Sequence, residues 1–303
     1  MIYDILIVGG GPAGLCAALY ARRAGKTALV IEKNTFGGQI TWSPRVENFP
    51  TEKSISGLAL ADKMLDQAMG QGADIELDEV VSAEKREGLF YIKTAFGSEF
   101  CGKTIIIATG AKPRRLNLAN EEKFIGQGIS FCAVCDGEFY KDKVVAVVGG
   151  GNTALQEALY LSDICRRVYL IHRRDEFRAD KALCDVIPQR ENVELVLNSF
   201  VTELLGDTKI NGVKLESKNG EAREISLDGL FIAVGHEPEN QAFANLVALD
   251  EGGYADVGES CEASPDGVFV AGDCRKKSVR QLTTAVSDGA VSALAACAYI
   301  DKT

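Results

Sequence analysis

The stretch DILIVGGGPAG, residues 4–14, decides the fold of this chain. It joins an apolar, strand-like run to a glycine-rich turn of the form G-x-G-x-x-G, and a helical run follows. Gly9 permits the tight turn, Gly11 lets the backbone approach a phosphate, and Gly14 lets the helix pack closely on the strand. The next strand-like run ends at Glu32, where a carboxylate can bind a ribose hydroxyl. These features predict a dinucleotide-binding βαβ unit.

The same pattern occurs a second time, in residues 143–172. An apolar run leads into a second glycine turn, formed by Gly149, Gly151 and Ala154, and a helical run and another apolar run follow. Apolar strands that alternate with helices in this way are typical of parallel sheets whose faces are covered. The chain therefore contains two segments of one architecture.

Two further apolar runs, 104–110 and 229–235, occupy equivalent places late in the two segments. A last run, 267–273, has no counterpart in the second segment, which indicates that the second copy is inserted into the first. We expect an α/β fold with two Rossmann-like dinucleotide-binding domains, each a three-layer ββα arrangement with a parallel sheet. The expected domains are residues 1–115 with 244–303, and residues 116–243.

The composition excludes several classes of protein. A chain of 303 residues is long enough for two domains. The net charge of −10 argues against a general nucleic-acid binder and against a protein of anionic membranes. The first residues show no basic leader, and we expect no apolar stretch of about 18 residues that could span a membrane. Nine scattered cysteines in a chain of this size favour the reducing cytoplasm.

The second glycine turn is followed by a basic cluster, HRRDEFR, in residues 172–178. His172 stands where the first segment has its acid. A carboxylate at this place would repel a ribose 2′-phosphate, whereas guanidinium groups pair with it through two parallel hydrogen bonds. We therefore expect this site to prefer NADP(H) over NAD(H). The alternative is a surface turn in which Asp175 and Glu176 neutralise the arginines.

Two dinucleotide sites, one of them for a phosphorylated nucleotide, suggest a hydride donor and a flavin. Gly272 and Asp273 follow an apolar strand, which suits binding of the ribityl and phosphate side of FAD. The run after Gln281 is expected to be a helix whose N-terminus faces the flavin and stabilises negative charge there. That helix can equally serve as a packing element, and both interpretations are compatible.

The C-x-x-C pair, Cys132 and Cys135, has three possible uses. A zinc site needs about four ligands, and the only two histidines belong to other motifs, so we expect no metal. A structural disulfide that closes so short a loop removes little chain entropy. A redox-active pair remains, in which Asp136 can carry the proton that a departing thiolate needs. Asp136 can also simply form a turn with Gly137.

These motifs together resemble the low-molecular-weight, bacterial-type thioredoxin reductases, nearly from end to end. Departures are few: Val134 replaces the threonine common between the cysteines, and Trp42 and Pro44 stand where small polar residues are usual. The stretches that carry the resemblance are GGGPAG, GGQ at 37–39, VENFP at 46–50, ATGAKPR, CAVCDG, GGGNTA, HRRDEFRA, AVGHEP and GDCRKKSVRQLTTA.

The resemblance implies an NADPH-dependent flavoprotein disulfide reductase that acts on thioredoxin. It implies a homodimer, and an inserted domain that rotates between two poses. Cys135 would lie against the flavin, Cys132 would attack the partner's disulfide, and Asp136 would be the acid–base residue. Three alternatives stay open: another dithiol protein as acceptor, reduced ferredoxin as donor, or a flavin redox sensor without turnover.

The resemblance also assigns cofactor contacts, which lie in the two glycine turns and in the loops after the strands. For FAD they are Gly9, Gly11, Gly14, Glu32, Gly37, Gly38, Gln39, Asn48, Thr109, Gly110, Asp273, Arg280 and Gln281. For NADPH they are Gly149, Gly151, Asn152, Thr153, Ala154, His172, Arg173, Arg174 and Arg178.

Overall fold

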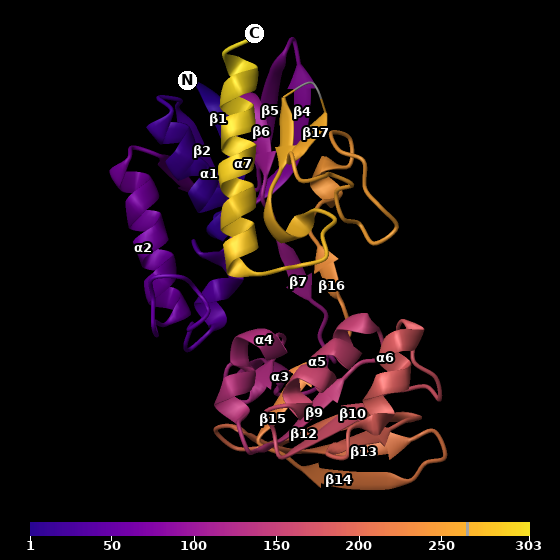
Figure 1. The fold of residues 1–303 in the computed structure, drawn as a ribbon. Coiled ribbons are helices and arrows are strands. Elements are labelled where there is room, and N and C mark those ends of the chain that lie inside the picture. The colour runs from indigo at the N-terminus through magenta and orange to yellow at the C-terminus, as the bar shows by residue number, and fades with distance from the viewer. Residues whose placement is uncertain (265–266) are drawn as a thin grey trace. The chain divides into compact units, whose positions relative to one another are not determined.

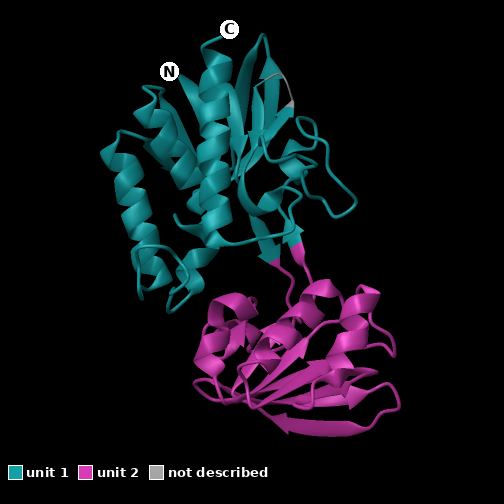
Figure 2. Ribbon diagram, viewed as in Figure 1, with its two compact units in different colours: residues 1–112, 237–303 teal, residues 113–236 magenta. Residues whose placement is uncertain are grey.

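The structure is a computed structural model that describes residues 1–264 and 267–303. The chain divides into two compact units, coloured separately in Figure 2: unit 1 is Met1–Lys112 with Glu237–Thr303, and unit 2 is Pro113–His236. The chain passes between the units through β7 (Ala111–Pro113) and β16 (His236–Pro238), which pair as a two-stranded sheet.

The predicted boundary at 244 lies later in the chain than the division between His236 and Glu237. The reason is the short segment after β16, whose Phe243 packs in the core of unit 1 beside Val247 and Val257. The predicted boundary at 115 lies three residues after Lys112, the last residue of the first segment of unit 1. The crossings therefore fall at the paired strands β7 and β16, directly after the apolar runs 104–110 and 229–235.

Unit 1 is built on a sheet in which β1, β2, β3, β6 and β18 run parallel (Figure 1). The sheet continues through antiparallel partners at β17 and at the hairpin of β4 and β5, which joins it at β6. The strands are β1 (Ile2–Val8), β2 (Ala28–Glu32), β3 (Asp74–Leu77), β4 (Val80–Arg86), β5 (Leu89–Thr94), β6 (Glu99–Ile107), β17 (Glu262–Ser264) and β18 (Val268–Val270).

Successive residues of a strand point to opposite sides of the sheet, and both faces of this sheet are buried. In β1, Ile5 and Ile7 belong to a core shared with α1 (Pro12–Arg23) and α7 (Leu282–Ile300). The intervening Leu6 and Val8 belong to a second core, which contains Phe90 of the hairpin. A third helix, α2 (Gly57–Gly70), packs beside α1 in the helical layer and was not predicted from the sequence.

Helix α7 is the one helix of the described residues that is long and apolar enough to cross a membrane by length and composition alone. This corrects the expectation that the chain has no such apolar stretch. The composition of α7 has a local cause, because a Cβ at Gly289 would lie 2.2 Å from the Ala13 carbonyl oxygen of α1. Small residues are therefore required where the two helices meet. The preceding residue of α7, Asp288, is also buried and forms an ion pair with Arg275.

Unit 2 repeats this plan with a five-stranded parallel sheet of order β11-β10-β9-β15-β8. Helix α5 (Asn152–Ser162) packs on one face, and an antiparallel sheet of β12, β13 and β14 covers the other. The predicted α/β class with two Rossmann-like three-layer units is confirmed. The other helices and strands are α3 (Glu121–Phe124), β8 (Ile129–Ser130), α4 (Ala133–Asp136), β9 (Val144–Val148), β10 (Arg167–Ile171), α6 (Lys181–Val186), β11 (Val193–Val196), β12 (Ser199–Gly206), β13 (Ile210–Ser217), β14 (Ala222–Ser226) and β15 (Gly229–Ile232).

Candidate redox and cofactor-binding sites

The first glycine turn lies between β1 and α1 and is open at one position. A Cβ at Gly9 would lie 2.3 Å from the Ala108 carbonyl oxygen, and a Cβ at Gly14 would lie 1.9 Å from the Gly9 carbonyl oxygen. A Cβ at Gly11, in contrast, would meet no atom within 4 Å. The N-terminus of α1 has no side-chain cap, so no capping side chain takes up its first N–H groups. The turn can therefore accept a phosphate.

Glu32, at the end of β2, fixes the shape of the turn. One carboxylate oxygen accepts the Gly10 N–H at 2.7 Å, and the other accepts the Asn34 N–H at 2.9 Å. Two more predicted residues join it, since the Gly37 N–H donates to the Gly10 carbonyl oxygen at 2.7 Å and a Cβ at Gly38 would lie 3.4 Å from the Gly11 Cα. The structure thus brings these predicted contacts together on one side of unit 1.

Asp273, in the turn after β18, carries an unsatisfied buried atom. Its Oδ1 is inaccessible to solvent and has no hydrogen-bond partner among the described residues. Burial raises the pKa of this carboxyl, while Lys277 and Arg280 lower it. An orphaned acceptor beside an open phosphate turn fits a ligand that brings hydroxyl groups, as a flavin dinucleotide does.

Three other predicted FAD contacts are held by neighbours within unit 1. Arg280 lies over the ring of Tyr254, with 4.4 Å between the guanidinium carbon and the ring centroid. Gln281 forms a capping box at the start of α7, and its side-chain oxygen accepts a long hydrogen bond of 3.4 Å from Asn48. Gln281 is the N-cap of α7 and Arg280 directly precedes it, so these contacts hold both side chains at the start of this helix.

Asn240 is a residue of this region that the sequence did not single out. It is fully buried, its Nδ2 donates to the carbonyl oxygens of Gly253 and Cys274, and its Oδ1 accepts from the Thr109 hydroxyl at 3.0 Å. Asn240 therefore ties the predicted Thr109–Gly110 turn to the segment after β18. Gln39, which follows Gly38, contacts the residue after Gly110: its side-chain amide donates to the Ala111 carbonyl oxygen at 2.8 Å.

The second glycine turn has the same geometry as the first. A Cβ at Gly149 would lie 2.3 Å from the Ala233 carbonyl oxygen, whereas a Cβ at Gly151 would meet no atom within 4 Å. Ala154 is buried beneath the turn and Thr153 is exposed. Asn152 does not point freely into the open space, because its side chain exchanges two hydrogen bonds with Asp180, at 2.7 and 2.9 Å.

His172 packs against the second glycine turn at Gly150. Its ring is buried, stacks on Phe177 and donates from Nε2 to the Glu176 carbonyl oxygen at 3.1 Å. A Cβ at Gly150 would lie 2.1 Å from the ring. Burial lowers the pKa of His172, and the neighbouring arginines lower it further. A neutral, packed imidazole suits a structural role, so direct contact of His172 with NADPH stays a prediction.

The basic cluster folds back onto the turn through the Arg178 N–H, which donates to the Gly150 carbonyl oxygen at 2.7 Å. Within residues 1–264 and 267–303, Arg173, Arg174 and Arg178 form no ion pair. This argues against the alternative in which acidic neighbours neutralise them. The three guanidinium groups are available to an external anion.

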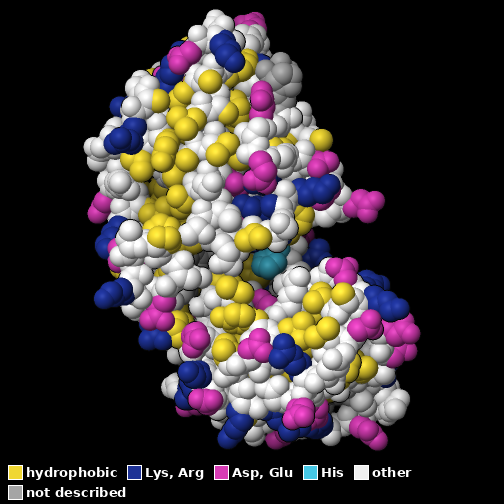
Figure 3. All heavy atoms as spheres, in the orientation of Figure 1, with side chains coloured by type: hydrophobic (Ala, Val, Ile, Leu, Met, Phe, Trp, Pro, Cys, Tyr) yellow, Lys and Arg dark blue, Asp and Glu magenta, His cyan; other side chains and the backbone are white. Residues whose placement is uncertain are grey.

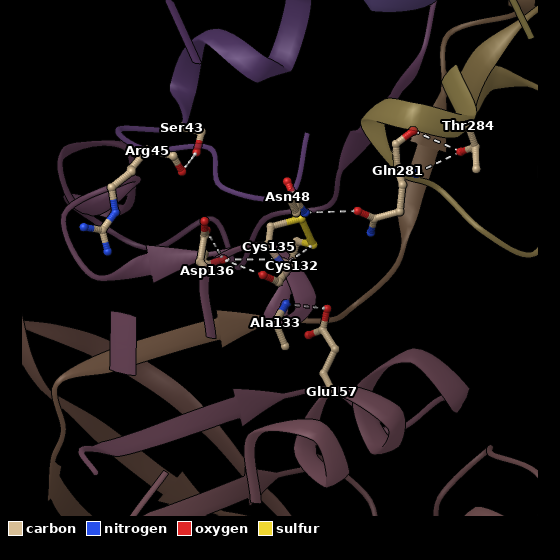
Figure 4. The surroundings of a disulfide bond; sticks show 11 residues. Ser43, Arg45, Asn48, Cys132, Ala133, Cys135, Asp136, Glu157, Gln281 and Thr284 are labelled. Atoms are coloured by element: carbon tan, nitrogen blue, oxygen red, sulfur yellow. Dashed lines mark hydrogen bonds between the residues drawn. A yellow bond between two sulfur atoms is a disulfide. The ribbon is translucent and has the colours of Figure 1, made fainter. Parts of the chain in front are cut away.

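Cys132 and Cys135 form a disulfide at the start of α4, with 5.3 Å between their Cα atoms (Figure 4). The Cys132 N–H donates to the Ser130 hydroxyl at 3.1 Å, and that hydroxyl donates to the Asp136 carboxylate at 2.7 Å. Burial raises the pKa of Asp136, while the Ser130 hydroxyl lowers it. The structure therefore links a carboxyl of raised proton affinity to the backbone of Cys132 through the Ser130 hydroxyl.

Two polar residues around this pair were missed by the sequence analysis. Ser130 links Asp136 to the backbone of Cys132, and Glu157 of α5 accepts the Ala133 N–H at 3.3 Å. Ser130 precedes the motif by two residues and could have been noticed, whereas nothing in the sequence brings Glu157 to the motif before the fold is known.

The remaining cysteines are unpaired thiols, and most are buried. In the part of the chain that the structure describes, no three His, Cys, Asp or Glu side chains are grouped to hold a metal ion. The disulfide is thus the redox-active candidate. The free cysteines are Cys16, Cys101, Cys165, Cys184, Cys261, Cys274 and Cys297.

Comparison with known proteins gives one consistent result. Residues 3–289 match the pyridine nucleotide-disulphide oxidoreductase family. The chain is 42% identical to a thioredoxin reductase of Listeria monocytogenes over 99% of this chain and 95% of that one. It is 41% identical to that of Treponema pallidum over 99% and 97% of the chains. The crystal structure of thioredoxin reductase from Streptococcus pyogenes superposes with a TM-score of 0.94 at 37% identity, covering 100% of this chain and 99% of that chain. The chain therefore belongs to the pyridine nucleotide-disulphide oxidoreductase family, and within it to the bacterial-type thioredoxin reductases.

Proposed function

We propose that this chain is a thioredoxin-disulfide reductase, an NADPH-dependent flavoprotein that reduces oxidised thioredoxin through Cys132 and Cys135. The observation that carries this proposal is the disulfide beside a partly buried acid, in a unit whose glycine turn is followed by three arginines without an ion pair among the described residues. Full-length similarity to thioredoxin reductases supports the same activity.

Unit 1 is proposed as the FAD-binding domain. The open position at Gly11 would take the pyrophosphate, and the orphaned Oδ1 of Asp273 would accept from a ribityl hydroxyl. Arg280 and Gln281, at the start of α7, would lie nearest the flavin ring. When bound, FAD takes a hydride from NADPH and delivers two electrons to a disulfide.

Unit 2 is proposed as the NADPH-binding domain. Gly151 leaves room for the pyrophosphate at the N-terminus of α5. Arg173, Arg174 and Arg178 would bind the 2′-phosphate through charge-assisted hydrogen bonds. His172 would hold their loop in place by stacking on Phe177.

Cys132 and Cys135 are proposed to reduce the thioredoxin disulfide. Two electrons break the Cys132–Cys135 bond and leave one thiol and one thiolate after uptake of one proton. Cys132 would attack the thioredoxin disulfide and form a mixed disulfide with one of its sulfurs. Cys135 would then attack this mixed disulfide, which re-forms the Cys132–Cys135 bond and releases reduced thioredoxin. Asp136, held by the Ser130 hydroxyl, would supply a proton to the departing sulfur.

A homodimer is part of the proposal. Hydrophobic side chains gather on the face of unit 1 over α1 and α7 (Figure 3). Tyr20 of α1, Leu58 of α2, and Val291 and Leu294 of α7 are exposed hydrophobic residues of this helical layer. Association of two copies would bury such a surface. The free thiols fit the proposed location in the reducing cytoplasm.

The two crossing segments are proposed as hinges for the inserted domain. Gly110 precedes β7 with φ +72°, and Gly235 precedes β16 with φ +104°. Such backbone angles are open to glycine at little cost, so these positions tolerate the dihedral changes that a rotation needs.

The test is an anaerobic titration of the FAD-bound protein with NADPH, followed by turnover with thioredoxin. We expect NADPH to bleach the flavin absorbance and the thioredoxin disulfide to be reduced catalytically. Absence of bleaching would exclude NADPH and leave reduced ferredoxin as the donor to try. Bleaching without thioredoxin turnover would point to another dithiol acceptor, and oxidation limited to a single turnover would indicate a sensor.

A further inference from the structure

Glu157 is a buried carboxyl that the proposed reaction does not use. It lies on α5 and is 9% exposed, and its carboxyl points towards the backbone of α4 beneath the disulfide (Figure 4). Oε1 accepts the Ala133 N–H at 3.3 Å. Oε2 is inaccessible to solvent and has no hydrogen-bond partner among the described residues. A half-satisfied buried carboxyl is costly, so it calls for a reason.

The surroundings of Glu157 favour its neutral form. Its pKa is raised to about 7, chiefly by burial and further by the negative charge of Asp136, against the Ala133 N–H, which lowers it. The other elements packed on α5 bring Arg167 and Tyr169 from β10 and Lys181, Cys184 and Asp185 from α6; β9 and the 187–189 turn bring no titratable group. On α5 itself the other titratable side chain is Tyr160. None of these contributes to the shift at Glu157.

A purely structural use of Glu157 is to anchor α4 through the Ala133 N–H. One oxygen is enough for that purpose, and a glutamine would serve it equally well. The feature that an anchor does not need is a second, unpartnered oxygen able to hold a proton. The other oxygen of the same carboxyl accepts the N–H of Ala133, the residue after Cys132, where negative charge develops when the disulfide opens.

We propose that Glu157 is a positioning residue that takes up a proton when the Cys132–Cys135 disulfide is reduced. The inference rests on the proposed function in treating these cysteines as the redox-active pair. Two electrons break the S–S bond, and one proton converts one sulfur to a thiol while the other remains a thiolate. A second proton, from solvent, binds the Glu157 carboxylate, so that thiolate and carboxylate are not charged together in a poorly solvated place.

The test compares the protein with its Glu157→Gln variant, which keeps an acceptor for the Ala133 N–H and removes the proton. The FAD-bound enzymes are equilibrated anaerobically with dithiothreitol from pH 6 to 9, quenched in acid and alkylated. Mass spectrometry of the peptide that contains Cys132 and Cys135 then gives the reduced fraction. Dithiothreitol reads the cysteines whether or not NADPH reduces them, so failure of this inference and failure of the proposed function are distinguishable.

The quantity compared is the equilibrium constant for reduction of the Cys132–Cys135 disulfide at a fixed reference potential. Above pH 7 we expect this constant to fall with each pH unit in both proteins, and to fall by an additional factor of ten in the unmodified protein. The additional tenfold corresponds to one extra proton bound on reduction. Glu138→Gln, which removes an exposed carboxylate close to the same cysteines, is expected to follow the unmodified protein. Superimposable pH profiles for the unmodified protein and Glu157→Gln would overturn the inference.

A second measurement covers the case in which Glu157→Gln fails to fold. In the Asp136→Asn variant, infrared difference spectra at pH 8 are recorded before and after reduction with dithiothreitol. A protonated-carboxyl band that appears on reduction supports proton uptake at Glu157. Its absence contradicts it.

Discussion

Cys132 and Cys135 are three residues apart, yet their proposed roles differ. Replacement Cys135→Ser removes the sulfur assigned to the flavin side and makes an internal disulfide impossible. We expect thioredoxin reduction to be lost while NADPH still bleaches bound FAD, because hydride transfer needs neither cysteine. Stopped-flow absorbance and a thioredoxin turnover assay measure the two steps. Cys184→Ser, a change at a partly exposed free thiol of the same unit, should leave both intact. Loss of bleaching in Cys135→Ser would contradict the proposed order of electron flow.

Glu157 also predicts a pH effect on stability. Its pKa rises from 4.5 to about 7 in the folded chain, so the folded state holds the proton more tightly than the unfolded state. The free energy of unfolding should therefore fall as pH rises from 4.5 to 7, by about 3 kcal/mol for a change of this size. Glu157→Gln lacks this contribution and should gain stability relative to the unmodified protein over that range, as measured by urea unfolding. A constant difference between the two across this range would rule the effect out, and Glu138→Gln serves as the control.

The two glycine turns make a crossed prediction at the scale of the βαβ element. Gly11 has φ −74° and open space around a Cβ, so Gly11→Ala should preserve the fold but intrude on the phosphate. We expect weaker FAD binding by tenfold or more, with an unchanged melting temperature of the FAD-free protein. Gly151→Ala should instead raise the KM for NADPH and leave FAD bound.

Gly14→Ala is the matched contrast for this experiment. Its Cβ would lie 1.9 Å from the Gly9 carbonyl oxygen, so it should lower the melting temperature as well as FAD binding. Equal FAD affinity in Gly11→Ala and the unmodified protein would mean that the first turn does not hold the pyrophosphate.

The loop after β10 is proposed to set the nucleotide preference. On this proposal, Arg173→Ala with Arg174→Ala would remove two charge-assisted hydrogen bonds to the 2′-phosphate, each worth about 1.5–3 kcal/mol. Steady-state kinetics should show a KM for NADPH raised at least tenfold, with NADH use changed by about twofold or less. Arg190→Ala, which breaks only a surface ion pair with Asp163, is the control. Equal losses with both nucleotides would show that these arginines do not read the 2′-phosphate.

Local sequence patterns were sufficient for the elements that surround the glycine turns. Strand, turn, helix and strand follow one another within about thirty residues there, so the periodicity alone identifies them. Helix α2 and the three-stranded sheet of unit 2 were not identified from the sequence. For α2 a signal was present, because its apolar residues follow a helical pattern and Ser56 caps its N-terminus. In the site, Asn240 and Glu157 had no such local signal, because they act on segments distant in the sequence, and only the folded chain brings them there.

At the scale of the whole molecule, the helical layer of unit 1 predicts the oligomeric state. Leu294 of α7 is 53% exposed within the hydrophobic surface over α1 and α7. We expect the unmodified protein to sediment at twice the chain mass and Leu294→Glu to shift it towards the monomer. Phe96→Glu changes an 86% exposed residue in the turn after β5 and should leave the dimer unchanged. A monomeric unmodified protein would refute the dimer, and a dimeric Leu294→Glu variant would place its interface elsewhere.

The pairing of β7 with β16 has an evolutionary consequence. Strands paired in a sheet lie about 5 Å apart, so the entry and exit of residues 113–236 are neighbours in space. A segment with adjacent ends can be acquired, lost or exchanged in a single genetic event without breaking the host sheet. Nucleotide preference and thiol chemistry would then be inherited together as one cassette, independently of the host that receives it.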